Sequence, residues 1–341
     1  MPIAKSQKRY EHGDLLHQAI NHPFGKLTEA LFSFMWAKSQ GKRSDISRSF
    51  TPYFDALLEE GESVIYAKTI LAEYLYYSYL FLPEWTETNI IPLFDWENET
   101  LANQYWLAFM YRPALSKELT EKVKGFLIQS FQSNRLAFFE RYGARRNLVH
   151  MATNLMLDGT FNEGEAKIIL SALNPSDKAD IIFYLEGSIN SETDIEKKNA
   201  KWEKYRDWLL KYAPLYPFST PEPSSALTGL LLVLDTNIVN RDWPSIKRII
   251  GPISNDLWLT YRKLTAKGRK EDNNQAAPHP LWNNPDLIVD IINHITPDEI
   301  SRSSMAVNNL GEILTSIESE LSNYAKDSRY IRLKNIHTKL E

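Results

Sequence analysis

The sequence predicts an all-α protein, an irregular α-solenoid or multi-helix array of antiparallel, HEAT-like helix pairs with little or no β-structure. Three observations support this prediction. Apolar residues recur at helical spacing, prolines and capping residues stand where helices would begin, and alternating β-branched runs and hairpin dipeptides are scarce. With ordinary helix and loop lengths, 341 residues would form about fifteen helices. A compact multi-helix domain with a C-terminal appendage is the alternative.

The stretch NHPFGKLTEALF, residues 21–32, is predicted to be the start of a helix rather than a catalytic or binding site. Asn21 or His22 would stand at the cap, and Pro23 suits the first turn because it needs no hydrogen-bond partner. Gly25 inside that turn costs about 0.5–1 kcal/mol relative to alanine, so we expect a neighbouring backbone to approach closely. A phosphate-binding loop would need several glycines ahead of the helix. Asn21, Pro23 and Gly25 are therefore predicted to form a structural motif.

Helical periodicity predicts the elements that follow along the chain. Residues 64–82 have an apolar spine surrounded by five tyrosines, which indicates a central helix. Residues 116–131 place Leu119, Val123 and Leu127 on one face and charged residues on the other. The same pattern recurs over 202–212 and 310–321. The run at 230–234 could be a buried strand, but its continuation to Ile238 favours a buried helix.

Helix-start signals are consistent with these periodic segments. Asn174, Pro175 and Asp177 fit the cap, the first helical position and the positive end of the helix dipole. Thr51-Pro52 and Thr296-Pro297 predict two further helix starts.

Proline content suggests the domain organisation. Residues 1–213 are expected to form an N-terminal helical array, 214–225 a Pro-rich connector, and 226–341 a C-terminal helical array packed on the first. One continuous domain is the alternative. Residues 267–284 are polar and interrupted by prolines, so they are expected to form a long exposed loop.

Composition narrows the setting. The net charge of −4 supplies no bulk positive field for nucleic acid or anionic lipid. Absence of cysteine excludes disulfides, thiolate nucleophiles and Cys-based zinc sites. The first residues carry no apolar signal-peptide core, so a cytoplasmic location is expected. The most apolar window, 64–82, contains Lys68 and Glu73 and is followed by Pro83, which favours a buried helix over a membrane span.

No catalytic, cofactor-binding or metal-binding constellation is predicted. His12, His17 and His22 are five residues apart and would point in different directions on a helix. The sequence lacks Gly-x-Ser-x-Gly, and its neighbouring carboxylates have no predicted partner across a cleft. An enzymatic activity and a bound cofactor are therefore not expected. His150, among apolar residues, is expected to be a hydrogen-bonded core residue.

Two basic clusters and several tryptophans are candidates for partner binding. Basic residues also form solvated helix faces and salt bridges, and acidic neighbours such as Glu140 favour that interpretation here. Tryptophans dominate interface hot spots, although most are core residues. The predicted partner-binding residues are Arg141, Arg145, Arg146, Trp85 and Trp96. The first basic cluster comprises Arg141 and Arg145, with Arg135 and Arg146 close by, and the second comprises Lys263, Lys267, Arg269 and Lys270.

Several segments together resemble one family. They include NHPFGKLTEALF, the block from Ile90 to Phe131, HMATNLMLDG, ALNPSDKADIIFYLEGSI, YPFSTPEPSSALTGLLLVL and DSRYIRLKNI. These are similar to the α-helical C-terminal domain carried by bacterial antiphage proteins whose N-terminal half is sirtuin-like. The resemblance covers about residues 15 to 335. It implies a helical half that senses or scaffolds beside a half that consumes NAD.

The sequence departs from that family in one respect. No Gly-x-Gly-x-x-Gly dinucleotide fingerprint precedes the helical part, so no NAD-hydrolysing residue is carried over. Whether the chain is a remnant, a stand-alone subunit or part of a longer protein stays open.

The function expected from the resemblance is a non-catalytic helical scaffold or sensor of bacterial antiphage defence. It would bind a protein partner, either a phage component or an effector domain, and no membrane. A nucleic-acid-binding helical repeat using the two basic clusters is the first alternative. An enzyme with an unrecognised interhelical site is the second, and a purely structural oligomerisation module is the third. The trigger, the binding face and the oligomeric state stay open.

Overall fold

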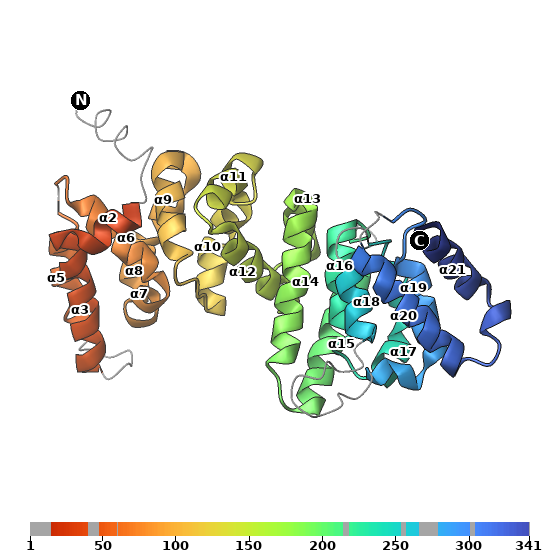
Figure 1. Ribbon diagram of the computed structural model, residues 1–341. Helices are drawn as coiled ribbons and strands as arrows, with labels where there is room; N and C mark the ends of the chain where they lie inside the picture. The colour runs from red at the N-terminus through yellow and green to blue at the C-terminus, as the bar shows by residue number, and fades with distance from the viewer. Residues whose placement is uncertain are drawn as a thin grey trace, which may run out of the picture. The chain divides into compact units, whose positions relative to one another are not determined.

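The computed structural model describes residues 15–39, 48–59, 61–213, 218–253, 257–265, 279–300 and 304–340 (Figure 1). Within these ranges the chain forms 19 α-helices and four short 3-10 helices, and no strand. The predicted all-α fold class is confirmed. More helices form than the expected number because short turns divide some of the predicted segments.

The chain forms two compact units, Met1–Ala172 and Leu173–Glu341. The described helices of the first unit are α2 (Leu15–Asn21), α3 (Pro23–Ser39), α5 (Thr51–Leu57), α6 (Val64–Glu73), α7 (Leu75–Phe81), α8 (Pro83–Asn89), η1 (Ile91–Phe94), η2 (Trp96–Asn98), α9 (Glu99–Phe109), α10 (Lys117–Gln129), α11 (Ser133–Arg141), α12 (Arg145–Leu157) and α13 (Glu163–Ala172).

The described helices of the second unit are α14 (Pro175–Asn190), α15 (Ile195–Tyr212), α16 (Pro221–Leu231), α17 (Thr236–Ile246), α18 (Leu257–Thr265), η3 (Pro280–Asn283), α19 (Pro285–Ile295), α20 (Ser304–Glu320), η4 (Tyr324–Lys326) and α21 (Ser328–Leu340).

The structure places the division between units earlier than the predicted connector at 214–225. That connector lies inside the second unit; residues 214–217 lie outside the described residues, and α16 begins at Pro221. The physical reason is that proline is tolerated in the first turn of a helix, where its missing N–H has no intrahelical partner. Ser224 N donates to Thr220 O at 3.0 Å and closes this turn. Of the predicted loop at 267–284, residues 267–278 also lie outside the described residues.

The single helix predicted over 64–82 is divided into α6 and α7, and α6 is a largely buried helix of the first unit. It packs against α2, α3 and α9, and Ala67, Ile70 and Leu71 are fully buried. Tyr74 separates α6 from α7, and Ser78 N donates to its carbonyl at 2.8 Å, so the chain turns only slightly there. None of the helices in the described ranges has both the length and the apolar character that a bilayer crossing requires.

The predicted structural motif of Asn21, Pro23 and Gly25 lies where α2 ends and α3 begins. His22, rather than Asn21, acts as the cap, because its Nδ1 accepts a hydrogen bond from Phe24 N at 3.2 Å. Asn21 Nδ2 instead donates back to His17 O at 2.9 Å, and Pro23 takes the first helical position. A methyl group built on Gly25 would lie 1.9 Å from the carbonyl oxygen of Ala19. The close approach of α2 therefore explains why glycine is needed.

The other start signals have different outcomes. Asn174 and Asp177 form a reciprocal capping box at the start of α14, with both hydrogen bonds at 2.9 Å. Helix α5 begins at the predicted Thr51-Pro52, but Phe50 rather than Thr51 stands at the cap and makes no side-chain capping bond. The start predicted at Thr296-Pro297 is wrong, because residues 296–300 are not helical. Thr296 Oγ1 bonds back to Ile292 O at 2.6 Å and so belongs to the end of α19.

The second unit is built from helices that contact each other two positions apart along the chain. Helix α14 packs on α16, α16 on α18, and α18 on α20, while α19 packs on α21. Side-chain hydrogen bonds make the same type of connection from α15 to α17 and from α17 to α19. This is the contact pattern of stacked helix pairs. The run predicted as a buried helix at 230–234 is helical to Leu231 and then turns.

Candidate protein-binding site

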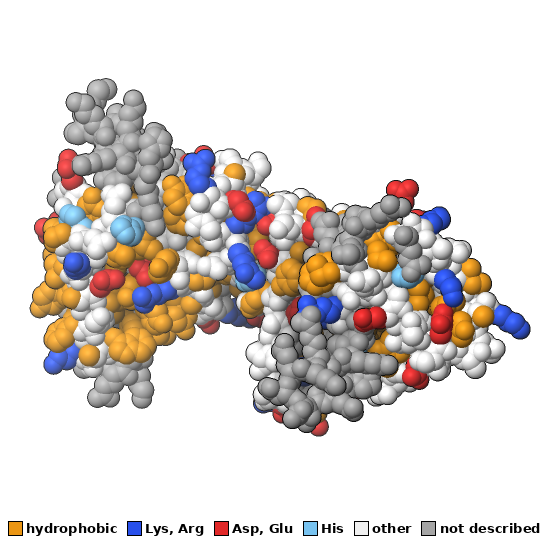
Figure 2. Space-filling view, in the orientation of Figure 1, with side chains coloured by type: hydrophobic (Ala, Val, Ile, Leu, Met, Phe, Trp, Pro, Cys, Tyr) orange, Lys and Arg blue, Asp and Glu red, His pale blue; other side chains and the backbone are white. Residues whose placement is uncertain are grey.

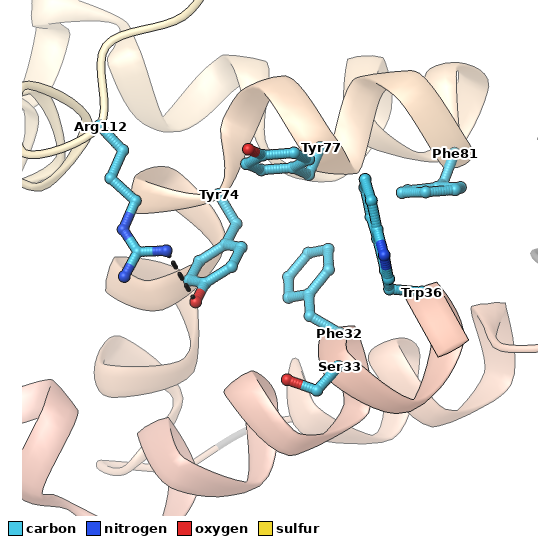
Figure 3. Close-up of a pocket in the computed structure, with 7 residues that line it drawn as sticks. All are labelled: Phe32, Ser33, Trp36, Tyr74, Tyr77, Phe81 and Arg112. Atoms are coloured by element: carbon cyan, nitrogen blue, oxygen red, sulfur yellow. Dashed lines mark hydrogen bonds between the residues drawn. The ribbon is translucent and has the colours of Figure 1, made fainter. Parts of the chain in front are cut away.

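An aromatic pocket lies in the first unit between α3, the α6–α7 junction and the turn after α9 (Figure 3). Its cavity has a volume of about 300 Å³, within the size range of ligand and side-chain pockets. The residues that line this pocket are Phe32, Ser33, Trp36, Tyr74, Tyr77, Phe81 and Arg112.

Helical spacing on two facing elements brings the five aromatic rings together. On α3, Phe32 and Trp36 are four residues apart and so lie on one side of the helix. Across the pocket, Tyr77 and Phe81 have the same spacing on α7, and Tyr74 immediately precedes that helix. The rings of these residues point toward one another in Figure 3. Two helix faces therefore form the pocket walls.

Ring contacts hold these walls in place. Phe32 stacks on Tyr74 with centroids 5.0 Å apart. Trp36 meets Tyr77 and Phe81 edge to face, at 5.7 and 5.4 Å. Phe32 and Phe81 are 5% and 1% exposed, whereas Trp36 is 46% exposed. The floor therefore belongs to the core, while Trp36 forms an open rim.

Arg112 supplies the charge at the opposite end of the pocket. Its Nε lies 2.9 Å from Glu73 Oε1, and its NH1 donates to the Tyr74 hydroxyl at 3.3 Å. The guanidinium carbon also lies 5.2 Å from the centroid of the Tyr74 ring. The Arg112 side chain is 53% exposed, but that of Glu73 is only 3% exposed. A buried carboxylate thus anchors a half-exposed guanidinium.

Burial changes the electrostatics of this pair. Burial raises the pKa of Glu73, although the nearby charge of Arg112 lowers it, and Glu29 raises it further. Glu73 Oε2 has no hydrogen-bond partner among the described residues. Burial also raises the pKa of the Tyr74 hydroxyl. The pocket therefore combines apolar walls with one anchored cation, which suits holding an apolar group beside an acceptor oxygen.

Exposed apolar side chains also lie outside the pocket on the first unit. Figure 2 shows hydrophobic side chains gathered over the region of α3, α7 and α8. Leu27, Phe34, Tyr53 and Tyr111 are 51%, 54%, 60% and 72% exposed. Large apolar groups left in solvent at this density are typical of interaction surfaces.

The two predicted tryptophans have structural contacts. Trp85 on α8 donates its Nε1–H to Asp55 Oδ1 at 2.7 Å and packs on Phe54, so it connects α8 to α5. Trp96 is only 6% exposed, donates to Phe126 O at 2.8 Å, and lies under the guanidinium of Arg135. Trp96 is thus a core residue and does not present a binding face.

The three predicted arginines lie at the corner between α11 and α12. Arg141 ends α11, Arg145 and Arg146 begin α12, and Gly143 turns the chain between them with φ of 69°. Arg145 Nε lies 3.5 Å from Glu140 Oε2. Arg141 and Arg146 are exposed. The structure brings these arginines together, and their part in binding stays a prediction.

The basic clusters give limited support to a nucleic-acid surface. Arg135, close to the first cluster in sequence, is buried. Its guanidinium stacks on the Trp96 ring and donates to Gln129 O at 2.8 Å. Of the second cluster, Lys263 is exposed on α18, and Lys267, Arg269 and Lys270 lie outside the described residues.

A second cavity of about 340 Å³ lies beside α12. His150, expected in the core, is half-buried and lines this cavity with Asn147, Asn154 and Asp158. No group of three or more His, Asp or Glu side chains in the described ranges is arranged to hold a metal ion.

Sequence reasoning did not identify the aromatic pocket, although part of its signal was visible. The tyrosines of residues 64–82 surround a predicted central helix, and Phe32 and Trp36 have helical spacing. Such spacing shows which side chains share a face. It does not show that the faces of α3 and α7 meet, nor that Arg112 reaches them from the turn after α9.

Comparison of the chain with protein-family models, curated proteins and solved structures gives no match. The functional inference therefore depends on the geometry of the pocket and its surroundings.

Proposed function

We propose that this chain is a non-catalytic helical scaffold or sensor that binds a protein partner through the aromatic pocket. The observation that supports this function is a preformed cavity whose floor is buried and whose rim, Trp36, is 46% exposed. By the resemblance described above, the setting would be bacterial antiphage defence in the cytoplasm. The partner would be a phage component or an effector domain.

The composition of the pocket matches that of protein-binding hot spots. Trp, Tyr and Arg are the residue types enriched where binding energy is concentrated, and all three line this cavity. Because Phe32 and Phe81 are fixed in the core, the walls need little reordering when a partner binds. An apolar or aromatic anchor of the partner would enter the cavity that these rings enclose, beside the exposed side of Trp36.

Arg112 would orient that anchor. An arginine carries five N–H donors, and the contacts of Arg112 engage Nε with Glu73 and NH1 with Tyr74. Donors that are not used in these two contacts can reach a carboxylate or carbonyl oxygen of the partner at the pocket mouth. Glu73 keeps the guanidinium in place, which lowers the entropy lost on binding.

The proposal is tested by photo-crosslinking in bacterial cells exposed to phage. A photoreactive phenylalanine analogue replaces Trp36 in the full chain, or replaces Phe183, which is likewise 46% exposed but lies on α14 of the second unit. We expect one protein to crosslink from position 36 and not from position 183. Equal labelling from both positions would contradict the proposal.

Purified partner then permits a quantitative test. Trp36→Ala should weaken its binding by ~30-fold or more, as expected for a hot-spot residue, and Arg112→Gln by a smaller factor. Phe183→Ala is the matched control and should leave the affinity within about twofold. Unchanged affinity in both pocket variants would show that the partner binds elsewhere.

A further inference from the structure

Helix α3 has two apolar stripes on opposite sides. The inward stripe is buried and consists of Gly25, Thr28, Phe32, Met35 and Ser39. The outward stripe, called the α3 ridge, repeats the spacing of the inward stripe but begins two residues further along the chain. It consists of Leu27, Ala30, Phe34 and Ala37. All four ridge residues are exposed, Leu27 by 51% and Phe34 by 54%. At 100° per residue, the ridge falls within an arc of about 80°.

Helix α10 of the same unit has a different arrangement. On α10, Leu119, Val123 and Leu127 are buried, whereas the outer face carries the exposed charges of Lys117, Glu118, Glu121 and Lys122. A helix that is apolar on two opposite sides normally has packing partners on both. Within the chain, the Phe34 ring meets Phe50 edge to face at 5.7 Å and lies under the Lys38 amine. Because Phe34 is still 54% exposed, the α3 ridge is a surface that another helix can cover.

We infer that the α3 ridge binds the α3 ridge of a second copy of this chain, antiparallel and about a two-fold axis. In this register Leu27 meets Ala37 of the second copy, and Ala30 meets Phe34. Each layer then contains one large and one small side chain, which is how packed helix interfaces are filled. A parallel pair would instead place Leu27 on Leu27 and alanine on alanine, leaving crowded layers beside empty ones.

The flanking charges are compatible with this self-association. Lys26 and Lys38 border the α3 ridge at its two ends. In the antiparallel register, Lys38 lies beside Leu31 of the second copy and Lys26 beside Ser33, so no two lysines are in contact. The ridge is self-complementary, as a two-fold interface requires. This inference does not depend on the proposed partner, because Trp36 and the aromatic pocket lie on a different side of α3 from the ridge.

The contact involves one helix from each chain, so it is small. Interfaces at the low end of the specific range bury about 1,200 Å² or less and are weak and reversible. We therefore expect a dimer that forms at micromolar concentrations and dissociates on dilution.

Sedimentation equilibrium of the full chain tests the interface. Between ~5 and ~500 μM, the average mass should rise from that of one chain toward that of two. Phe34→Lys should raise the dissociation constant at least ~10-fold. Phe183→Lys, at an exposed phenylalanine of the second unit, should leave it unchanged. A chain that stays monomeric throughout, or association that is insensitive to Phe34→Lys, would overturn the inference.

The register is tested separately by disulfide crosslinking. The chain contains no cysteine, so introduced thiols can pair only with each other. A mixture of the Leu27→Cys and Ala37→Cys variants should form a mixed disulfide dimer under mild oxidation, faster than either variant alone. Preferential Leu27→Cys homodimers would overturn the antiparallel register. Crosslinking no faster than that of Phe183→Cys would overturn the interface itself, and circular dichroism establishes that each variant folds.

Discussion

Two buried tryptophans of the first unit and two of the second have different hydrogen-bond acceptors. In the first unit, Trp96 and Trp106 donate their indole N–H groups to the backbone carbonyls of Phe126 and Phe94. In the second unit, Trp202 and Trp243 donate to carboxylates of other helices, Asp242 at 2.8 Å and Asp290 at 2.6 Å. The acceptors of Trp96 and Trp106 are thus neutral, whereas those of Trp202 and Trp243 are ionic. Each unit also contains the other kind of contact, since Trp85 donates to Asp55 in the first unit and Trp282 donates to Leu264 O in the second.

The surfaces differ in a related way. The first unit exposes phenylalanine, tryptophan and tyrosine around α3, α5 and the aromatic pocket. Among the described residues of the second unit, the exposed large apolar side chains are Phe183, Ile195, Met305 and Ile331, on four different helices. The proposed binding surface therefore lies on the first unit, whereas buried or half-buried carboxylates such as Asp242 and Asp290 connect helices of the second. Substitutions in each unit can test how far its helix connections and its exposed surface differ from those of the other.

The largest effect is expected where an ionic connection is removed. Asp242 is buried and accepts from Trp202, Arg206 and Arg241, so Asp242→Ala leaves an indole N–H and two guanidinium groups without this acceptor. The free energy of unfolding should fall by about 3–5 kcal/mol, measured by urea denaturation. Asp207 is the matched control.

Asp207 occupies the same position in a repeated Arg-Asp-Trp tripeptide, since residues 206–208 and 241–243 have identical sequences. Its side chain, however, is 69% exposed. Asp207→Ala should therefore cost less than about 1 kcal/mol. Similar losses in the two variants would show that the buried ionic connection does not dominate the stability of this unit.

A smaller loss is expected at the turn between α2 and α3. Gly25→Ala would place a methyl group 1.9 Å from the Ala19 carbonyl oxygen, and backbone cannot move aside as a flexible side chain can. We expect a loss of about 1–3 kcal/mol in the free energy of unfolding. Gly125→Ala, inside α10 with no atom within 4 Å of the new methyl group, should instead stabilise by about 0.5–1 kcal/mol. A neutral Gly25→Ala would contradict the close approach.

Features that depend on neighbouring residues could be predicted from the sequence. The capping box of α14 and the two faces of α10 follow from spacing over a few positions. Features set by distant contacts could not. Proline content suggested a connector at 214–225, yet Pro221 begins a helix, and Thr296 resembles a cap although its hydroxyl bonds back to α19.

The candidate site likewise depends on contacts between residues far apart in the sequence, which local spacing does not predict. Trp96 has the residue type of an interface anchor, but its burial by Trp106 and Arg135 depends on residues well separated in sequence. The aromatic pocket was missed because it requires α3 and α7 to face each other.

Acid should affect the two units differently, with a smaller effect than the substitutions above. Burial alone would raise the pKa of Asp242, but hydrogen bonds from Arg241 and Trp202 lower it overall. The pKa of Asp290 is likewise lowered overall, by Lys247 and Trp243. Their stabilisation is therefore present above the usual aspartate pKa of about 3.9 and is lost as pH falls through the lower folded-state pKa.

The pKa of Glu73, in the first unit, is shifted in the opposite direction to those of Asp242 and Asp290. Because burial raises its pKa, its contribution is most favourable below the usual glutamate pKa of about 4.3 and is lost as pH rises through the folded-state value. Hydrogen exchange at about pH 6 and pH 3 should show the second unit losing protection first on acidification. Earlier loss in α6 would contradict this contrast. Glu73→Gln should reduce the pH dependence of protection in the first unit.

The smallest effect on stability is expected at the residue that matters most for the proposed binding. Trp36 and Trp106 are both in the first unit, but Trp106 is fully buried and donates to Phe94 O, whereas Trp36 is 46% exposed. Trp106→Ala should cost about 3–5 kcal/mol in the free energy of unfolding, and Trp36→Ala less than about 1 kcal/mol. A residue that stabilises the fold so little, yet leaves a large aromatic surface in water, is better explained by binding than by packing. If Trp36→Ala destabilised the chain as much as Trp106→Ala, Trp36 would be a structural wall, and the aromatic pocket would lose its main support as a binding site.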